Sequence, residues 1–228
     1  MITVLIPVFN EERSVAGIIK EVFQLKFDKE IVVVDDGSTD KSFDIVKGLV
    51  DTYRVRLIKH KKNMGKGVAI KTGIKFARGD YFIIQDADFE YEPQDLEKIV
   101  RLIQPRDTNA YFFGIGYRKL NLGLNFRFFH NFINHLMTML INILFGGTIK
   151  DSYSGCKLFP LKFLKTVKLR SKRFEFEAEV CIKLLKKRYK VKQVQIKYIP
   201  RRAGEGKKIG IIDAIKGIIM IITERLLY

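Results

Sequence analysis

The first half of the chain alternates short apolar runs with amphipathic segments, and this pattern constrains the fold more than any other feature. Strand-like runs lie at residues 2–6, 30–35, 54–59 and 81–84, and helix-like segments lie at 15–23, 40–50, 67–77 and 93–103. Apolar strands separated by helices form right-handed βαβ units, whose parallel sheet is covered by helices on both faces. We therefore expect an α/β, Rossmann-like domain with a mostly parallel central sheet flanked by helices.

Polar residues follow three of these strands directly. Asn10 and Glu11 come after the first strand, Asp36 after the second, and Asp86 and Asp88 after the fourth. The carboxyl ends of parallel strands meet at one edge of the sheet, and ligands of such sheets bind beyond that edge. The sequence thus predicts that these side chains share a binding site.

The Asp86-Ala-Asp88 pair is the strongest chemical signal. Two carboxylates one residue apart repel each other unless a cation lies between them. Hard oxygen ligands of this kind suit Mg²⁺ or Mn²⁺, which would bridge to a diphosphate, and Glu90 could supply a third oxygen. A lone pair of this type is more often an acidic turn, but its position at a strand end favours a metal site.

Two loops that precede helices supply further candidate contacts. Asp36 is placed to accept hydrogen bonds from a base or ribose, although the same segment is also consistent with a plain turn in which Asp40 caps the next helix. Gly65 and Gly67 allow close backbone approach on either side of Lys66, which could meet a phosphate. The spacing is not that of a P-loop, so this signal is weak by itself.

The second half contains a long apolar segment. No Lys, Arg, Asp or Glu occurs from residue 128 to 149, where a narrow polar stripe is formed by Asn131, Asn134, Thr138 and Asn142. These polar groups make spanning a bilayer costly, so a helix lying in the membrane interface is favoured over a transmembrane one. A core or dimer helix is the alternative. The last segment, 209–227, is expected to be a second amphipathic helix.

The remaining second-half pattern predicts strands at 111–116, 154–159 and 191–199 and a helix at 176–187. The two cysteines, Cys156 and Cys181, are too far apart for a paired spacing and suit a reducing compartment. The N-terminal apolar run is too short for a signal peptide. These features favour a cytoplasmic protein.

The net charge of +17 is concentrated in residues 151–228, which hold 20 basic and 7 acidic residues. Such an excess indicates an anionic partner: nucleic acid, an anionic membrane or phosphorylated small molecules. Part of it lies on a glycine-containing loop that carries Arg201, Arg202, Lys207 and Lys208. A loop of this kind could close over a diphosphate, although a solvated loop is the ordinary interpretation of a charge run. Near the apolar segment, Arg118 and Arg127 are suited to hold a lipid phosphate.

Taken together, six segments resemble glycosyltransferase family 2, and within it the dolichol-phosphate mannose synthase and polyprenyl-phosphate glycosyltransferase group. The segments are Ile6–Glu11, Val33–Ser38, Asn63–Gly67, Gln85–Pro93, Asp151–Lys157 and Arg202–Lys208. Their order and spacing across nearly the whole chain make the resemblance specific. It implies a single GT-A domain, 1–228, with a nucleotide-sugar-binding half at 1–116 and an acceptor-binding half at 117–228. It also implies interface helices at about 124–145 and 209–227.

The resemblance distributes roles over the candidate residues. The nucleotide sugar is assigned to Pro7, Phe9, Asn10, Glu11, Asp36, Lys66, Asp86, Ala87, Arg202 and Lys208; the metal to Asp86, Asp88 and Glu90; and the acceptor phosphate to Arg118, Arg127 and Ser154. Catalysis is assigned to Asp86, Asp88, Asp151 and Arg202. Because the acceptor is already an anion, it needs no strong general base, and Asp151 is expected to orient the sugar or the acceptor.

The expected activity is transfer of a hexose, mannose or glucose, from a GDP- or UDP-sugar to a polyprenyl or dolichyl phosphate with inversion. The enzyme would act peripherally on the cytoplasmic face of a membrane, which it contacts directly or through a membrane-protein partner. Alternatives are a family 2 enzyme with another acceptor, a sugar nucleotidyltransferase, and a basic nucleic-acid-binding protein. The apolar segment and the lack of RRM, KH or OB signatures argue against nucleic acid.

Overall fold

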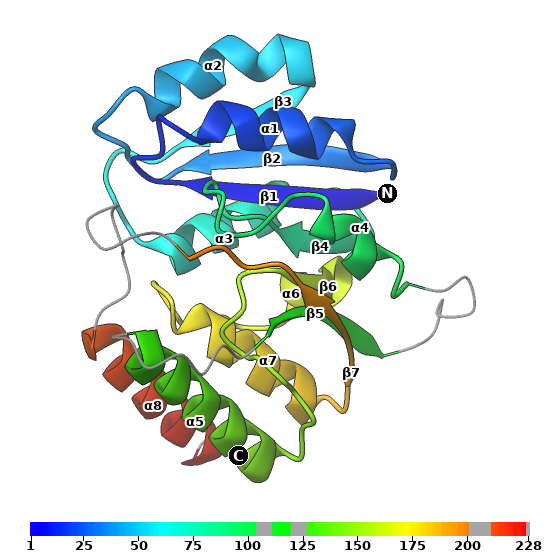
Figure 1. The fold of residues 1–228 in the computed structure, drawn as a ribbon, viewed down its shortest axis with the longest axis vertical. Helices are drawn as coiled ribbons and strands as arrows, with labels where there is room; N and C mark the ends of the chain where they lie inside the picture. The colour runs from blue at the N-terminus through cyan, green and yellow to red at the C-terminus, as the bar shows by residue number, and fades with distance from the viewer. Residues whose placement is uncertain (104–110, 120–126, 201–210, 227–228) are drawn as a thin grey trace.

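A seven-stranded sheet forms the centre of the computed structural model, which describes residues 1–103, 111–119, 127–200 and 211–226 (Figure 1). The strand order is β3 (Val55–Lys59), β2 (Lys29–Asp35), β1 (Ile2–Val8), β4 (Tyr81–Ile84), β6 (Lys157–Pro160), β5 (Phe112–Arg118) and β7 (Lys190–Ile196). Strands β1 to β4 are parallel to one another, and β5 is parallel to β7. Among the strands in the described residues, only β6 runs antiparallel to both of its neighbours. The expectation of a mostly parallel α/β sheet is confirmed.

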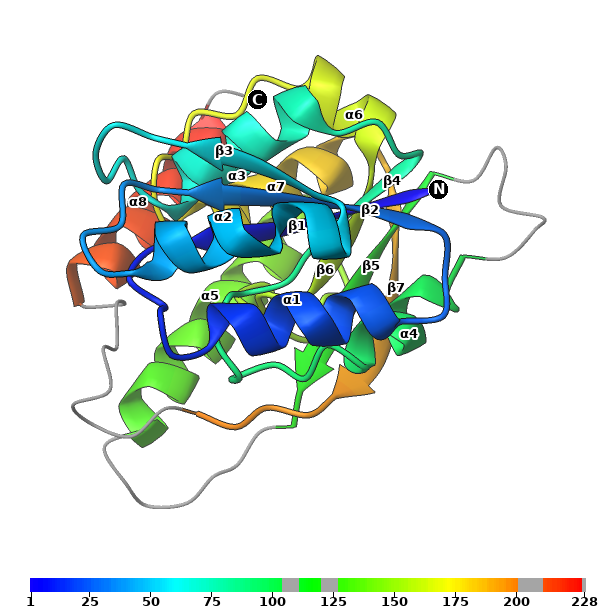
Figure 2. The ribbon, with the colours of Figure 1, turned by 90° about the horizontal axis from the view of Figure 1, so that it is seen from above.

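Helices cover both faces of the sheet, as Figure 2 shows. One face carries α1 (Val15–Gln24), α2 (Ser42–Tyr53) and α4 (Asp95–Val100), and the other carries α3 (Lys66–Phe76), α6 (Leu161–Thr166) and α7 (Phe176–Lys186). The apolar runs explain this arrangement because successive side chains of a strand point to opposite faces. In β1, Val4 and Ile6 face the core under α1, whereas Leu5 faces the core under α3. Strands buried on both faces need continuous apolar sequence.

Two longer helices, α5 (Arg127–Phe145) and α8 (Ile211–Leu226), pack against each other and against α7 at one end of the molecule (Figure 1). They lie within the predicted segments 124–145 and 209–227, whose remaining residues, 124–126, 209–210 and 227, are outside the described ones. None of the described helices combines the length and the apolar character needed to cross a membrane. The assignment of a donor half and an acceptor half stays a prediction, and β5 crosses their proposed boundary at residue 116.

Two residues of the polar stripe, Thr138 and Asn142, lie on the side of α5 that faces the protein. Asn142 exchanges hydrogen bonds with the backbone of Ile149, at 2.8 and 2.9 Å. The Thr138 hydroxyl lies 2.8 Å from the hydroxyl of Ser152 and accepts the Ser152 amide at 3.1 Å. The stripe therefore fastens α5 to the loop before β6, which leaves apolar side chains on the outer surface of the helix.

Local differences from the sequence expectations are small. The helix expected at 93–103 is the shorter α4, which ends at Val100, and the strand expected at 154–159 begins only at Lys157. The short α6 follows β6 directly and was not predicted, because its six residues are fewer than two full turns.

Candidate functional site

The candidate residues gather at one edge of the sheet because of the strand directions. The carboxyl ends of β1, β2, β4 and β5 point to the same edge, and the antiparallel β6 begins there. The loop of residues 151–156, which leads into β6, is thereby brought beside Asp86 at the end of β4 and Arg118 at the end of β5. The strand ends that these residues follow therefore lie at one edge of the sheet, and the shared binding site stays a prediction.

The loops after β1 and β2 are joined by hydrogen bonds. Asn10 Oδ1 accepts the amide of Thr39 at 2.8 Å, and the Asn10 amide donates to the hydroxyl of Ser38 at 3.0 Å. The amide of Glu11 donates to the hydroxyl of Ser42 at 2.8 Å. Pro7 lies within β1 and Ala87 is buried next to Asp86. The nucleotide-sugar roles of these residues and of Phe9 stay predictions.

Asp36 organises the loop that leads into α3. Its carboxylate accepts the amides of Met64 and Gly65, the latter at 2.7 Å, and lies 2.7 Å from Nδ1 of His60. Nε2 of His60 lies 2.9 Å from the Thr72 hydroxyl. Both oxygens of Asp36 therefore face protein groups, and its predicted contact with a nucleoside stays a prediction. His60 was not singled out from the sequence, since its partners come from distant positions.

Lys66, the first residue of α3, bridges two carboxylates. Its Nζ lies 2.7 Å from Asp86 Oδ1 and 3.2 Å from Glu177 Oε1. Burial lowers the pKa of Lys66, but attraction to Asp86 and Glu177 more than offsets the burial and holds the pKa above its ordinary value. Lys66 is thus a permanent cation beside the first acidic residue of the predicted metal pair. The expected contact was with a phosphate, which stays a prediction.

Glu177 is held in turn by a second lysine. Nζ of Lys157 contacts Glu177 Oε2 and donates to the carbonyl of Ser154. Lys157 is completely buried and Glu177 nearly so. Sequence reasoning missed both residues, although a lysine at the start of a buried strand is itself a signal, because an ammonium group is rarely buried without a paired charge.

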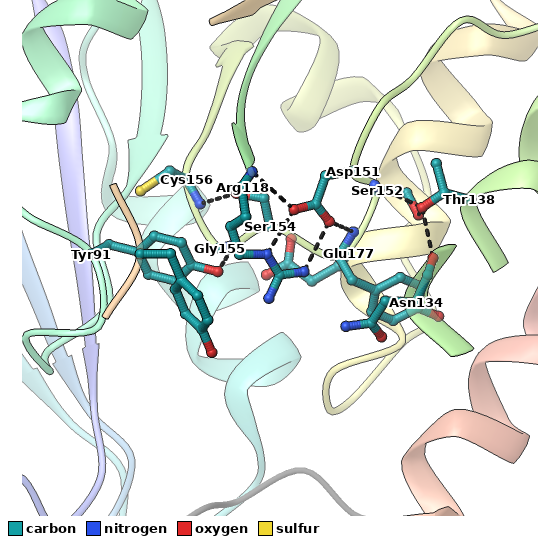
Figure 3. A network of polar contacts seen from close by, with 12 residues as sticks. Tyr91, Arg118, Asn134, Thr138, Asp151, Ser152, Ser154, Gly155, Cys156 and Glu177 are labelled. Atoms are coloured by element: carbon teal, nitrogen blue, oxygen red, sulfur yellow. Dashed lines mark hydrogen bonds and ion pairs between the residues drawn. The ribbon is translucent and has the colours of Figure 1, made fainter. Parts of the chain in front are cut away.

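Arg118 and Asp151 form a two-pronged salt bridge at the end of β5, shown in Figure 3. Asp151 also accepts the backbone amide of Tyr153 at 3.2 Å. Burial raises the pKa of Asp151, but the charge and hydrogen bonds of Arg118 outweigh it and hold the pKa below its ordinary value. An ionised, fully engaged carboxylate is a poor proton acceptor, which agrees with the expectation that Asp151 orients rather than acts as a base.

The loop before β6 lies close against Asp86. A Cβ atom at Gly155 would lie 2.5 Å from Asp86 Oδ2, and the amide of Gly155 donates to the Tyr91 hydroxyl at 3.2 Å (Figure 3). Ser154 is fully buried, and its hydroxyl accepts the amide of Cys156 at 3.3 Å. The predicted role of Ser154 in holding an acceptor phosphate stays a prediction.

The predicted metal ligands differ in their surroundings. Asp88 Oδ1 accepts the amide of Glu90 at 3.1 Å, whereas Glu90 Oε2 lies 3.4 Å from the hydroxyl of Tyr198. Within the described residues, no three His, Cys, Asp or Glu side chains are grouped so that they could hold a metal ion. Asp86 and Asp88 nevertheless fit Mg²⁺ or Mn²⁺, since Mg²⁺ is usually held by one or two carboxylates plus substrate phosphates. Because Gly155 has no side chain, nothing from this position crowds the carboxylate of Asp86.

Three predicted residues fall where nothing more is described. Arg202 and Lys208 lie in the segment 201–210, outside the described residues, and Arg127 begins α5 but its side chain is not described. Their assigned roles are unchanged predictions.

Residues 3–168 match the family model described as Glycosyl transferase family 2. The chain belongs to glycosyl transferase family 2. Membership makes it a glycosyltransferase and favours sugar transfer over the predicted nucleotidyltransferase and nucleic-acid-binding alternatives. Five of the six segments that carry the resemblance lie within the matched residues, and Arg202–Lys208 lies beyond them.

Relatives with named activities are similar over most of this glycosyltransferase. A UDP-N-acetylglucosamine–dolichyl-phosphate N-acetylglucosaminyltransferase of Methanococcus voltae is 29% identical over 87% of the chain and 86% of its own length. A dolichol-phosphate mannosyltransferase of Pyrococcus furiosus is 29% identical over 92% of the chain and 59% of its own length. These similarities place the glycosyltransferase in the group that sequence analysis had named.

Solved structures establish the fold class. A crystal structure of glucosyl-3-phosphoglycerate synthase from Mycobacterium tuberculosis with Mn²⁺, UDP and phosphoglyceric acid superposes with a TM-score of 0.75. The match covers 99% of this chain and 78% of that one at 17% identity. The glycosyltransferase therefore has the expected GT-A fold.

Proposed function

We propose that this glycosyltransferase moves a sugar from a UDP- or GDP-linked donor to a polyprenyl or dolichyl phosphate, with inversion, while bound peripherally to a membrane surface. The named relatives support a lipid phosphate acceptor. Their donors differ, since one name specifies N-acetylglucosamine and the other mannose. We therefore add N-acetylglucosamine to mannose and glucose as the sugars to be tested.

The observation that carries the proposal is the position of α5 between the site and an exposed apolar surface. Its inner side is hydrogen-bonded to the site loop through Thr138 and Ser152. Its outer side exposes four apolar side chains at helical spacing: Phe132, Leu136, Met139 and Ile143. Helix α5 therefore connects the site loop on its inner side to an outer surface that suits a lipid tail.

The neighbouring helix repeats the pattern. On α8 the exposed side chains are Ile215, Ile219, Ile222 and Leu226, again at spacings of four, three and four residues. We call these eight side chains on α5 and α8 the apolar surface. Exposed apolar clusters of this size mark membrane or protein contacts, and the exposed Lys216 and Arg225 beside them suit anionic lipid headgroups. Direct membrane contact is our proposal, with a membrane-protein partner as the alternative.

The proposed chemistry divides between the metal and the chain's own residues. When bound at Asp86 and Asp88, Mg²⁺ or Mn²⁺ would supply positive charge to the leaving diphosphate. Arg118 would orient the acceptor phosphate, and Asp151 would hold the guanidinium group of Arg118 in place. Because a phosphate acceptor is already anionic, no residue has to remove a proton. Arg202 and Lys208 are proposed as further phosphate contacts.

The proposal is tested by incubating the protein with Mn²⁺, labelled nucleotide sugars and a polyprenyl phosphate. We expect label to enter the lipid-extractable fraction with one donor, and EDTA to abolish it. A parallel reaction with 3-phosphoglycerate tests a soluble phosphorylated acceptor. Label in the soluble product alone, or no transfer to lipid from any UDP- or GDP-linked sugar, would contradict the proposal.

A further inference from the structure

Asp86, a proposed metal ligand, belongs to a cluster of four charges whose other three members have no role in the mechanism above. The cluster consists of Asp86, Lys66, Glu177 and Lys157, which alternate in sign along a chain of ion pairs. Lys66 touches a carboxylate on each side, and Glu177 touches an ammonium group on each side. The partners come from four different elements, namely α3, the end of β4, β6 and α7.

We propose that Lys66 is a built-in counter-ion that makes cation binding at Asp86 depend on the donor diphosphate. In this view Glu177 is a positioning residue that receives the Lys66 ammonium when the divalent ion binds. The inference rests on the proposed function, since it takes Asp86 as a metal ligand. It adds one condition to that function: the divalent ion binds at Asp86 only together with the donor diphosphate.

The charges of the cluster explain the condition. Its two carboxylates are already balanced by two ammonium groups, so it holds no surplus negative charge. A divalent ion that arrives alone has to displace the ammonium group 2.7 Å from Asp86 Oδ1 and then remain close to it. Repulsion between like charges is strong where water is largely excluded. The diphosphate of a donor brings the negative charge that the cluster lacks.

Glu177 is placed to take over Lys66 with little movement. Nζ of Lys66 is 3.2 Å from Glu177 Oε1. Within the described residues this buried oxygen accepts no hydrogen bond, so it has capacity for one from Lys66. Lys157 fixes the other oxygen of Glu177, and its own position is set by the Ser154 carbonyl. The ammonium group of Lys66 could therefore move from Asp86 to Glu177 by rotation of the flexible lysine side chain, and it would keep a carboxylate partner throughout.

Mn²⁺ binding measured by electron paramagnetic resonance, without and with UDP or GDP, tests the inference. For the wild type we expect weak binding of MnCl₂ alone and binding about tenfold tighter with the effective nucleotide, as is typical of coupled sites. Lys66→Met removes the charge and keeps an apolar stem. It should tighten binding of MnCl₂ alone about fivefold or more and reduce the effect of the nucleotide.

Glu177→Gln makes the opposite change, because Asp86 is then the one carboxylate left beside Lys66 among the described residues. We expect it to weaken Mn²⁺ binding in the presence of the nucleotide, while MnCl₂ alone stays weak. Thermal unfolding checks that each variant is folded. If Lys66→Met does not fold, Lys66→Gln removes the same charge, and Lys66→Arg should keep the wild-type pattern.

Lys183→Met is the matched control. Lys183 also lies between two carboxylates, 3.0 Å from Glu224 and 3.7 Å from Glu179, and its side chain is 14% exposed, as is that of Lys66. Because Lys183 is away from the end of β4, we expect its substitution to leave Mn²⁺ binding unchanged.

Two outcomes would overturn the inference, and they differ in whether the proposed function also fails. If the wild type binds Mn²⁺ with a nucleotide but Lys66→Met leaves binding of MnCl₂ alone unchanged or weaker, the four charges are only structural and the proposed function stands. If the wild type binds no Mn²⁺ with any nucleoside diphosphate tested, the metal-dependent mechanism and the inference fail together.

Discussion

Arg118 and Asp151, which are 33 residues apart, lock together through Nε and Oδ2 at 2.7 Å and through Nη2 and Oδ1 at 2.9 Å. The guanidinium group also lies 5.0 Å from the centre of the Tyr198 ring. A phosphate that approaches Arg118 therefore meets a cation with a fixed orientation. Planar recognition of phosphate depends on such an orientation, which a lysine would not provide.

Asp151→Asn should lower both stability and activity. It leaves the buried Arg118 guanidinium without its ion-pair partner, and breaking a buried pair in this way costs about 3 kcal/mol or more. Urea unfolding measures the loss. Because the pKa of Asp151 is lowered in the folded protein, its contribution is complete at neutral pH and disappears as the pH falls below about 4.

The acid dependence separates the charge of Asp151 from its packing. Wild-type stability should fall toward low pH by more than that of Asp151→Asn, so the two curves should converge in acid. Parallel curves from pH 7 to pH 3 would mean that the ion pair contributes nothing. Removal of the carboxylate should also raise the KM for the lipid phosphate if Arg118 loses its orientation.

Asp88→Asn should remove metal-dependent turnover and leave the fold intact. The carboxamide is a weaker ligand for a hard cation, so we expect transfer to lipid to fall about a hundredfold or more. The transfer assay with Mn²⁺ measures the effect, and circular dichroism checks the fold. Asp51→Asn is the control, since Asp51 is an exposed residue of α2. Full activity in Asp88→Asn would refute its assignment as a ligand.

Gly155→Ala should disturb Asp86 without changing any charge. The added methyl group would lie 2.5 Å from Asp86 Oδ2 and 3.2 Å from the ring of Tyr91, so the carboxylate has to move. A displacement of about 1 Å at a reacting site lowers turnover by roughly ten- to a hundredfold. Gly48→Ala is the control, because nothing lies within 4 Å of its added Cβ, and alanine favours a helix. Equal kcat values for the two variants would contradict the role given to Gly155.

Charges placed on the apolar surface should release the protein from membranes. Ile143 and Ile219 are 70% and 57% exposed, so Ile143→Asp and Ile219→Asp should leave the fold unchanged. Each buried apolar side chain of this size contributes about 1.5 kcal/mol or more, which corresponds to roughly a tenfold loss of binding per substitution. Co-sedimentation with anionic vesicles measures this loss of membrane binding. Phe23→Asp on α1, at the other end of the molecule in Figure 1, should bind as the wild type does. If a variant that combines Ile143→Asp and Ile219→Asp bound vesicles as well as the wild type, another surface would have to contact the membrane.

Local sequence patterns were sufficient for the main elements of the fold. The period of apolar residues predicted β1 to β4 and the helices between them, since strand and helix periods differ and both faces of the sheet are buried. The position of Asp86 and Asp88 after an apolar strand was enough to place them at the carboxyl edge of the sheet. Element ends were less accurate, as α4 and β6 show, because caps and pairing partners decide them.

The polar stripe of α5 shows where this reasoning reached its limit. The spacing of Asn134, Thr138 and Asn142 marked one face of a helix, but a spacing does not say what that face contacts. The structure turns Thr138 and Asn142 toward the loop before β6, where they hydrogen-bond to the Ser152 hydroxyl and the Ile149 backbone. The apolar face is left outside as a consequence.

The sequence by itself therefore determined the α/β architecture, the edge of the sheet at which the candidate residues gather, and the resemblance to the family. Only the tertiary structure decided which charges pair: Lys66 with Asp86 and Glu177, and Arg118 with Asp151. The reason is physical. Strand and helix periods are local properties of the chain, whereas an ion pair between residues 20 to 111 positions apart exists only after folding brings its partners together and excludes water around them.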